Sequence, residues 1–364
     1  MQNKRLQYFD ILKGIAIYMV VMGHVITFGI RDIDSSVFFK LVGHIHMPLF
    51  FFISGWFLSR RQQETGKIKP INIWKRFLQL IVPFVVVSAL WQWYYSHSGL
   101  QSPVCFSYEG LWFNNMKYGY WFTPCLFELI LVFAAIRPLF NRISNFWLQT
   151  LICLAVWVVL IFTSENIPDK YNGLFMVSNM VTYWPILMAG ALASYHSEGF
   201  NKLAKTSAAV TICLIICALS TYVVCYYWEF PIMDSYPILK NVAVIFFHVT
   251  LAIIEIAVAK PWSEKAFAPT ARKLTQNTAE LWAYLGRKSL SIYLLHYFFL
   301  FPMGAIRPML QSMNLDFAPV FAVAAVCAAM IIGIVLLIDA IIAKSPLLSM
   351  LLTGELKGIL TKKQ

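Results

Sequence analysis

The stretch DILKGIAIYMVVMGH, residues 10–24, decides the fold of this chain. It is an apolar run with the character of a helix, which opens on Asp10 and Lys13 and ends on His24. Lys13 and His24 are eleven residues apart. At 3.6 residues per turn they share one helix face, roughly 16 Å apart along the axis. Ionisable side chains at that depth in hydrocarbon are costly, so they indicate a functional path if the helix lies in a membrane.

Composition places this helix in a membrane. The 364 residues are 59% hydrophobic and only 13% charged, whereas a soluble domain has about 25% charged residues. Mean hydropathy is +0.67. We therefore expect an all-α, polytopic integral membrane protein. The first apolar run is about 20 residues long without a small-residue cleavage site, so it is predicted to be an anchor and not a cleaved signal peptide.

Apolar windows of about 20 residues, long enough to cross ~30 Å of hydrocarbon, recur ten times. The longest connection, about 260–282, is too short to fold alone, so residues 1–364 are predicted to form one transmembrane domain with no appended soluble domain. The ten predicted spans lie near 9–29, 37–58, 77–95, 120–137, 147–163, 177–195, 208–228, 240–259, 283–304 and 318–343.

The basic residues predict the orientation of these spans. With ten spans, 22 Lys and Arg residues fall on one side and 6 on the other, which is strong positive-inside asymmetry. Both termini are therefore expected in the cytoplasm. The net charge of +12 is explained by these loops, and nucleic-acid binding is not expected. The two densest segments, 60–76 and 260–288, either determine topology alone or also attract anionic lipid headgroups or a polyphosphorylated cytosolic ligand.

The cysteines and the short motifs exclude several other classes. The seven cysteines include no CxxC pair and fall mostly in predicted spans, so neither a disulfide framework nor a metal site is expected. The sequence contains no Walker, GxGxxG, GxSxG or HExxH motif, which argues against the common ATPase, Rossmann and hydrolase classes. No tightly bound cofactor is predicted.

Histidines gather in the outer half of the first two predicted spans. The second span carries GHIHMPLFFFISGW at 43–56, so His44 and His46 enter the membrane from the same side as His24. Two antiparallel neighbours would bring His24 and His46 to similar depth. Because imidazole exchanges its proton near neutral pH, such a pair suits general-base or proton-relay work. The alternative is a histidine that only makes a packing hydrogen bond across the bundle.

Other polar residues in the spans also have two interpretations. Lys13 either pairs with Asp10 at i,i+3 or offers its charge to a phosphate or carboxylate arriving from the cytosol. Ser54 and Gly55 are predicted to form a close helix-packing seam. Glu128, one turn below the Pro124 break, either acts in the site or makes a buried structural hydrogen bond. Further candidates are His248, Glu255, Ser291, His296 and, as a pairing residue, Asp339.

Four blocks together resemble the acyltransferase 3 family of integral membrane O-acyltransferases, and most of all its branch of fucose 4-O-acetyltransferases and related sugar acetyltransferases. The blocks appear in the family's order and the resemblance covers residues 5 to about 343. They are RLQYFDILKGIAIYMVVMGH at 5–24, HIHMPLFFFISGWF at 44–57, GYWFTPCLFEL at 119–129 and SLSIYLLH at 289–296.

The resemblance implies an activity and a set of site residues. The family's hallmark is an Arg or Lys, ten residues and then a His in the first helix, which falls here on Lys13 and His24. Lys in place of the commoner Arg keeps the charge but loses the bidentate fork. The family implies acetyl-CoA as the cytosolic donor and a hydroxyl, usually of a carbohydrate, as the acceptor. The SGNH-hydrolase-like domain that some members append is not expected here.

These observations predict an O-acetyltransferase of the bacterial inner membrane that modifies a surface glycan or its lipid-linked precursor. His24 would be the general base or a transient acyl carrier, and His46 and Glu128 would orient the acceptor or relay its proton. The rival hypothesis is a transporter or flippase for a glycan or polyol, with the same residues as a proton relay. The oligomeric state is left open. Residues predicted to hold the coenzyme are Lys13, Arg60, Arg61, Lys75 and Arg76.

Overall fold

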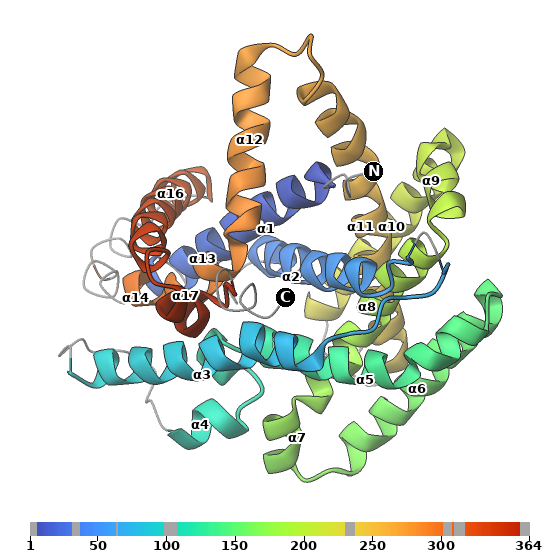
Figure 1. The fold of residues 1–364 in the computed structure, drawn as a ribbon, viewed down its shortest axis with the longest axis horizontal. Coiled ribbons are helices and arrows are strands. Elements are labelled where there is room, and N and C mark those ends of the chain that lie inside the picture. The colour runs from blue at the N-terminus through green and yellow to red at the C-terminus, as the bar shows by residue number, and fades with distance from the viewer. Residues whose placement is uncertain are drawn as a thin grey trace.

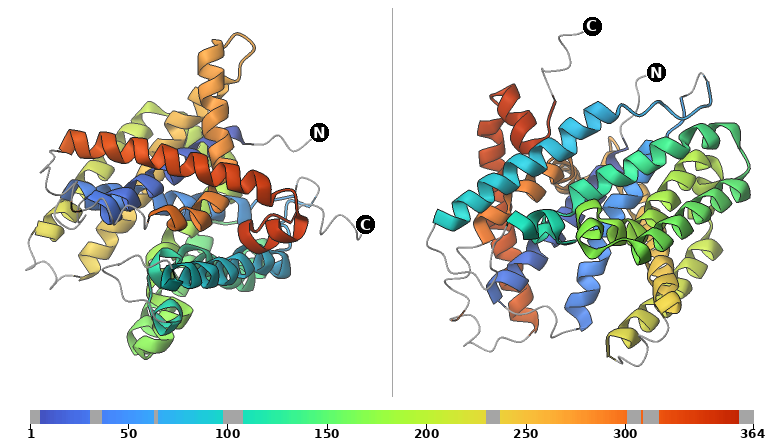
Figure 2. Two further views of the ribbon diagram at one scale, coloured as in Figure 1. Left: turned by 90° about the vertical axis from the view of Figure 1, so that its left-hand side faces the viewer. Right: turned by 90° about the horizontal axis from the view of Figure 1, so that it is seen from below.

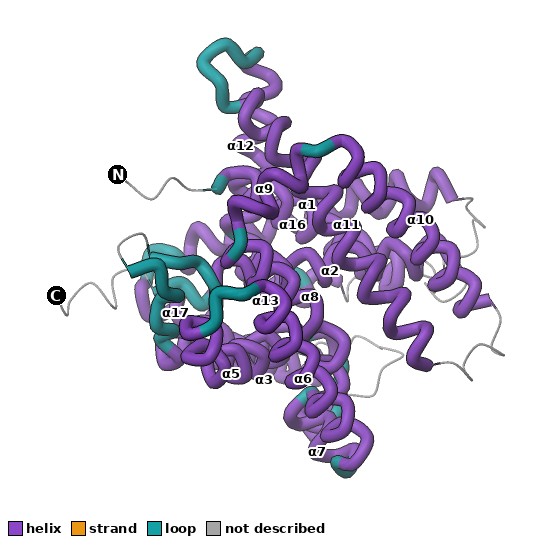
Figure 3. The backbone as a smooth tube through the Cα atoms, turned by 90° about the vertical axis from the view of Figure 1, so that its right-hand side faces the viewer, coloured by secondary structure: helices purple, strands orange, loops and turns teal. Residues whose placement is uncertain are grey.

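The computed structural model describes residues 6–30, 37–62, 65–97, 108–229, 237–300, 308 and 317–356. This part of the chain is built from helices joined by short connections, and its one β feature is an isolated bridge between Arg61 and Ile68 (Figures 1 and 3). The helices before residue 170 are α1 (Gln7–Val25), π-helix η1 (Ile26–Ile30), α2 (Val37–Leu58), α3 (Ile73–His97), α4 (Tyr108–Phe113), the 3-10 helix η3 (Lys117–Gly119), α5 (Phe122–Arg142), α6 (Phe146–Asn166) and α7 (Asp169–Phe175). The later ones are α8 (Val177–Tyr195), α9 (Ser197–Lys205), α10 (Ser207–Glu229), α11 (Pro237–Ala266), α12 (Lys273–Arg287), α13 (Ser289–Leu295), α14 (Tyr297–Leu300), α16 (Phe317–Ile342) and α17 (Pro346–Thr353).

Seven helices in the described ranges are long and apolar enough to cross a membrane, and α7 with α8 forms an eighth candidate bent by 42°. These helices coincide with eight of the ten predicted spans. Large apolar side chains point outward from them, such as Trp147, 76% exposed on α6, and Leu337, 70% exposed on α16. An outer surface of this kind suits hydrocarbon and not water. The protein is therefore a multi-pass, all-α membrane protein.

The two remaining predicted spans differ from the others. The span predicted at 37–58 coincides with α2, whose side chains are described from Ile45 onward; Ile45–Leu58 is a shorter apolar helix. The span predicted at 283–304 as one continuous helix is wrong. The chain instead forms α12, α13 and α14, with breaks at Lys288 and His296, and residues 301–304 lie outside the described part.

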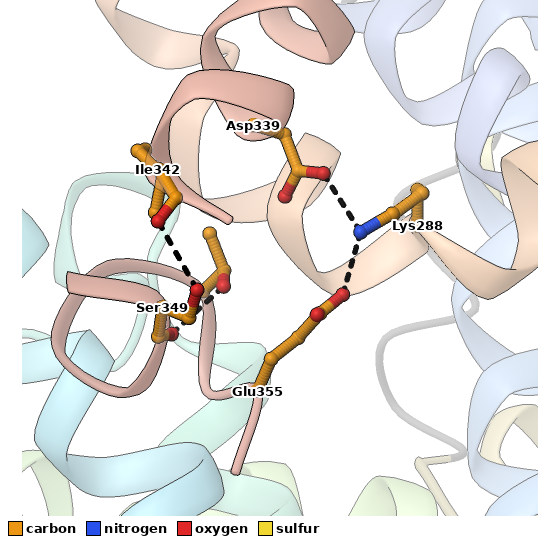
Figure 4. A network of polar contacts seen from close by, with 6 residues as sticks. Lys288, Asp339, Ile342, Ser349 and Glu355 are labelled. Atoms are coloured by element: carbon orange, nitrogen blue, oxygen red, sulfur yellow. Dashed lines mark hydrogen bonds and ion pairs between the residues drawn. The ribbon is translucent and has the colours of Figure 1, made fainter. Parts of the chain in front are cut away.

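An ion-pair network explains the first of these breaks. Lys288 leaves the helical region, with φ −98° and ψ 7°. Its Nζ lies 2.8 Å from an Asp339 carboxylate oxygen on α16 and 2.6 Å from one of Glu355, just after α17 (Figure 4). A partly buried lysine is stabilised by two carboxylates, and these contacts pin the α12–α13 junction to the C-terminal helices. The prediction that Asp339 is a pairing residue is confirmed.

Helix α1 is packed against α12, α2, α16 and α11, and most of its residues are buried. It crosses α12 at two glycines. A Cβ atom on Gly14 would lie 2.0 Å from the carbonyl oxygen of Trp282, and one on Gly286 would lie 1.7 Å from that of Asp10. Both separations are far below van der Waals contact, so only glycine allows this backbone approach. Small residues at helix contacts are a common device in membranes, where packing drives helix association.

A second glycine seam joins α2 to α8. A Cβ atom on Gly55 would lie 1.8 Å from the Leu187 carbonyl oxygen, and one on Gly190 would lie 2.0 Å from that of Phe52. The predicted packing role of the Ser54–Gly55 segment is thereby confirmed. Around these two seams α6 packs on α8, α10 on α11, and α3 on both α5 and α17 (Figure 2).

Gly286→Ala tests the α1–α12 seam. We expect it to destabilise the protein by about 1–3 kcal/mol, because the added methyl group forces two packed backbones apart. Gly333→Ala in α16 is the matched control, since a Cβ atom there meets nothing within 4 Å. Thermal unfolding in detergent should show a lower midpoint for Gly286→Ala alone. Equal midpoints for the two variants would contradict the close crossing.

Candidate active site

The candidate site is centred on His24, in the last turn of α1. Its imidazole is partly accessible, and its Nε2 lies 3.0 Å from the Tyr297 hydroxyl on α14. The His24 ring is 5.0 Å from the Tyr297 ring and 5.4 Å from that of His296, centroid to centroid. His24 Nε2 is thus at hydrogen-bond distance from a hydroxyl group.

His296 is the second imidazole of the site, at the break between α13 and α14. It is completely buried, and its Nδ1 lies 2.9 Å from the backbone carbonyl oxygen of Ile292. A carbonyl oxygen can only accept, so Nδ1 carries the proton and donates it. In this neutral tautomer Nε2 is a bare lone pair, and it has no hydrogen-bond partner among the described residues. The His296 ring also packs 4.3 Å from that of Tyr297.

Further aromatic rings pack on Tyr297, beside the two imidazoles. The Tyr120 ring is 5.0 Å from that of Tyr297, and the Trp91 ring is 6.3 Å from it. The Tyr120 hydroxyl donates to the Leu294 carbonyl oxygen at 3.2 Å. These contacts lock the start of α5 and the middle of α3 against α13 and α14.

Tyr293 closes the same wall from α13. Its hydroxyl donates to the Gly119 carbonyl oxygen at 2.9 Å and accepts from the Phe122 backbone N–H at 3.1 Å. A single buried hydroxyl therefore satisfies two backbone groups at the start of α5. The neighbouring Thr123 is completely buried, and its hydroxyl has no hydrogen-bond partner in the described part of the chain.

Lys13 lies on the same helix as His24, toward the other end. Its Nζ pairs with an Asp10 carboxylate oxygen at 2.9 Å, which confirms the predicted i,i+3 contact. The Lys13 side chain remains 22% exposed, whereas that of Asp10 is 7% exposed. A lysine held by one carboxylate and still partly accessible keeps donor capacity for an anionic ligand.

The other four predicted coenzyme contacts lie after α2 and in the first turn of α3. Arg60, Arg61 and Lys75 are exposed and Arg76 is half-buried. The Arg61 guanidinium lies 4.8 Å above the Tyr195 ring, and Arg76 Nη1 donates to Gln79 Oε1 at 3.2 Å. Their convergence with Lys13 on one ligand stays a prediction.

Glu128 and Lys117 occupy the α5 side of the molecule. One carboxylate oxygen of Glu128 is buried without a hydrogen-bond partner in the described residues. Lys117 is 2% exposed, and its Nζ donates to the carbonyl oxygens of Trp112 at 2.7 Å and Gly173 at 3.0 Å. Burial lowers the pKa of Lys117 to about 8, although the negative charge of Glu128 opposes the shift. Lys117 thus ties α4 and α7 together, and a role for Glu128 in the reaction stays a prediction.

The remaining sequence-predicted histidines have different outcomes. His46 is buried on α2, which packs directly on α1, and its pairing with His24 stays a prediction. The side chain of His44 lies outside the described residues. Among the described side chains, the ring of His296, a lesser candidate in the sequence, lies 5.4 Å from that of His24.

Sequence reasoning missed the tyrosines of the site. Tyr297 directly follows His296, and Tyr120 directly precedes the Trp121–Phe122 pair. Neither residue stands out in the sequence, because tyrosines are common at membrane interfaces. The signal that could have found Tyr297 is its position beside a histidine within a predicted span.

An apolar cavity of about 330 Å³ lies elsewhere, between α6, α8 and α11. Its walls include Trp157, Trp184 and Met188, and its polar side chains are Thr150 and Cys153. Its described lining contains no acid–base pair and is distinct from the His24 site. His24 therefore remains the candidate site.

Comparison with known proteins assigns the family. A family model described as an acyltransferase domain matches residues 6–339. The nodulation protein NolL of Sinorhizobium fredii is 37% identical over 92 residues, 24% of this chain and 25% of that protein. NolL of Mesorhizobium japonicum is 29% identical over 197 residues, 50% of this chain and 49% of that protein. The matches thus span at most about half the length of these relatives, and no solved structure matches.

The family match covers nearly the whole chain, including both His24 and His296. The chain therefore belongs to the acyltransferase family, as the four sequence blocks predicted.

A pH prediction follows from Lys117. Because its folded pKa of about 8 lies below the ordinary 10.5, the unfolded state binds more protons on this group between these values. The contribution of Lys117 to the free energy of unfolding is therefore lowest below pH 8 and increases as pH rises toward 10.5. The unfolding midpoint of the wild type minus that of Lys117→Met, measured from pH 7 to 10, should increase. A flat or falling difference would contradict the burial of a charged Lys117.

Proposed function

We propose that this protein transfers an acyl group, namely acetyl, from acyl-CoA to a hydroxyl of a cell-surface glycan or its lipid-linked precursor. The observation that carries the proposal is the 3.0 Å contact between His24 Nε2 and the Tyr297 hydroxyl. The His24 imidazole is partly accessible, and the chain belongs to the acyltransferase family. An imidazole that binds a hydroxyl in this way is placed to remove its proton.

In the proposed reaction His24 acts as a general base. The acceptor oxygen attacks the thioester carbonyl carbon, a C–O bond forms and the C–S bond breaks. The hydroxyl proton passes to the His24 imidazole and then to the departing thiolate, which leaves as coenzyme A. The Tyr297 hydroxyl occupies the position on Nε2 that an acceptor hydroxyl needs, so it yields that position to the substrate.

The proposed orientation assigns a side to each substrate. Lys13 faces the cytosolic end and helps hold the phosphates of the coenzyme, with Arg60, Arg61, Lys75 and Arg76 as further contacts. His24 lies farther along the same helix, where an acceptor from the outer side meets the acyl group. Support for this assignment comes from the basic asymmetry of the loops and from the partial exposure of Lys13. The membrane would be the bacterial inner membrane.

His24→Ala tests the role of the imidazole. Purified protein in detergent is given radiolabelled acetyl-CoA and a panel of methyl pyranosides, and acetylated sugar is measured. We expect transfer to fall about 10²- to 10⁴-fold, the usual contribution of a general base. His97→Ala, which removes an exposed histidine of α3, is the matched control and should keep full activity.

The same assay separates the enzyme from a transporter or flippase. Full transfer by His24→Ala at normal membrane abundance would exclude His24 as the base. Saturable uptake of a pyranoside into vesicles without acetyl-CoA, together with no transfer by the wild type, would favour the transporter.

Lys13 variants test the coenzyme end. Lys13→Ala should raise the KM for acetyl-CoA about tenfold or more, because a charge-assisted contact to phosphate is lost, while the KM for the sugar stays within about twofold. Lys13→Arg should retain most of the affinity, since it restores charge and a phosphate-matching fork. An unchanged KM for acetyl-CoA in Lys13→Ala would remove Lys13 from the donor site.

A further inference from the structure

Among the described residues, His296 Nε2 is a buried polar atom of the site without a hydrogen-bond partner. The carbonyl of Ile292 fixes the proton on Nδ1, so Nε2 presents a lone pair in a completely buried ring. The described residues supply it with no donor. Leaving such an acceptor unpaired costs about 1–3 kcal/mol, so a site that keeps it needs a donor from elsewhere.

The surroundings of this lone pair indicate what the donor is. The His296 ring is 5.4 Å from that of His24, whose own Nε2 binds a hydroxyl. The Tyr297 ring packs against both imidazoles, and the ring centroid of Tyr293 lies 6.4 Å from that of His296. Two imidazole rings 5.4 Å apart with aromatic neighbours suit adjacent hydroxyl groups on a molecule that also has apolar C–H faces.

Charge narrows the choice of ligand further. His296 in its neutral tautomer is an acceptor at Nε2 and attracts no anion there. The polar group that satisfies it must donate a hydrogen bond, as a hydroxyl does and as the coenzyme phosphates, which we assign to Lys13, do not. Because the neighbouring His24 is proposed to bind the hydroxyl that reacts, we assign the ligand of His296 to the same hydroxyl-rich acceptor.

We propose that His296 is a specificity-determining residue that binds a second hydroxyl of a polyhydroxylated acceptor, next to the hydroxyl that reacts at His24. When Tyr297 withdraws from His24, both imidazoles become open to the substrate. Two adjacent hydroxyls then place the reacting oxygen, because one is held by each ring. This inference rests on the proposed function and adds to it the requirement for a diol in the acceptor.

His296→Met and His296→Gln are the test pair. Met fills a similar volume without an acceptor, whereas the Gln amide oxygen reaches close to the position of Nε2. The probes are the methyl pyranoside that the wild type acetylates fastest and its monodeoxy analogues, each missing a hydroxyl beside the acetylated one. For His296→Met we expect the KM for the parent sugar to rise about tenfold, which corresponds to the loss of one hydrogen bond worth about 1.4 kcal/mol. The KM for acetyl-CoA should stay within about twofold.

The deoxy analogues and the stability of the variants complete the test. One analogue should lose about tenfold in kcat/KM with the wild type and lose almost nothing further with His296→Met, whereas His296→Gln should stay within about threefold of the wild type. The unfolding midpoint of His296→Met should equal or exceed that of the wild type, since an unsatisfied polar atom is removed.

Three results would overturn the inference. An unchanged KM for the sugar in His296→Met would show that Nε2 holds no substrate hydroxyl, with water as its partner. A lower unfolding midpoint for His296→Met, together with equal losses in kcat/KM for the sugar and for acetyl-CoA, would show that His296 has a structural role. If the losses in kcat/KM caused by His296→Met and by the missing sugar hydroxyl were additive, the imidazole and that hydroxyl would not contact each other. Failure of the wild type to acetylate any pyranoside would instead contradict the proposed function.

Discussion

The site depends on the close crossing of α1 and α12 at Gly14 and Gly286. Because neither residue has a side chain, the two backbones touch, and each helix is fixed against the other. The chain then breaks at Lys288 and α13 returns along α1. His24 follows Gly14 by ten residues and His296 follows Gly286 by ten, so the seam brings the two imidazoles together. The contacts of Lys288 with Asp339 and Glu355 hold the break in place.

The polar groups of the site differ in what they bind. Tyr293 and Tyr120 use their hydroxyls to satisfy backbone groups, and they serve as rigid walls. His24 is engaged by the Tyr297 hydroxyl, and His296 Nε2 has no hydrogen-bond partner among the described residues. In a protein surrounded by hydrocarbon such an atom is costly, which is why we propose that it binds the acceptor.

Much of this arrangement was predictable from the sequence, and the reasons for the rest are physical. Hydropathy alone located α1, α3, α5, α6, α8, α10, α11 and α16, because each must match the thickness of a bilayer. Hydropathy could not show that the 283–304 segment breaks, since the cause is an ion pair with residues about fifty and seventy positions later. The spacing of Lys13 and His24 predicted that α1 carries the candidate site. The contact of His24 with Tyr297 joins positions 273 residues apart and has no local signal.

The proposed line from Lys13 to His24 is best tested by a structure of the protein with a non-reactive thioether analogue of acetyl-CoA. We expect the coenzyme phosphates to lie beside Lys13 and the carbon in the acyl position to lie within about 4 Å of His24 Nε2, on the side that faces His296. Coenzyme bound in the apolar cavity between α6, α8 and α11, or with its acyl end away from His24, would contradict it.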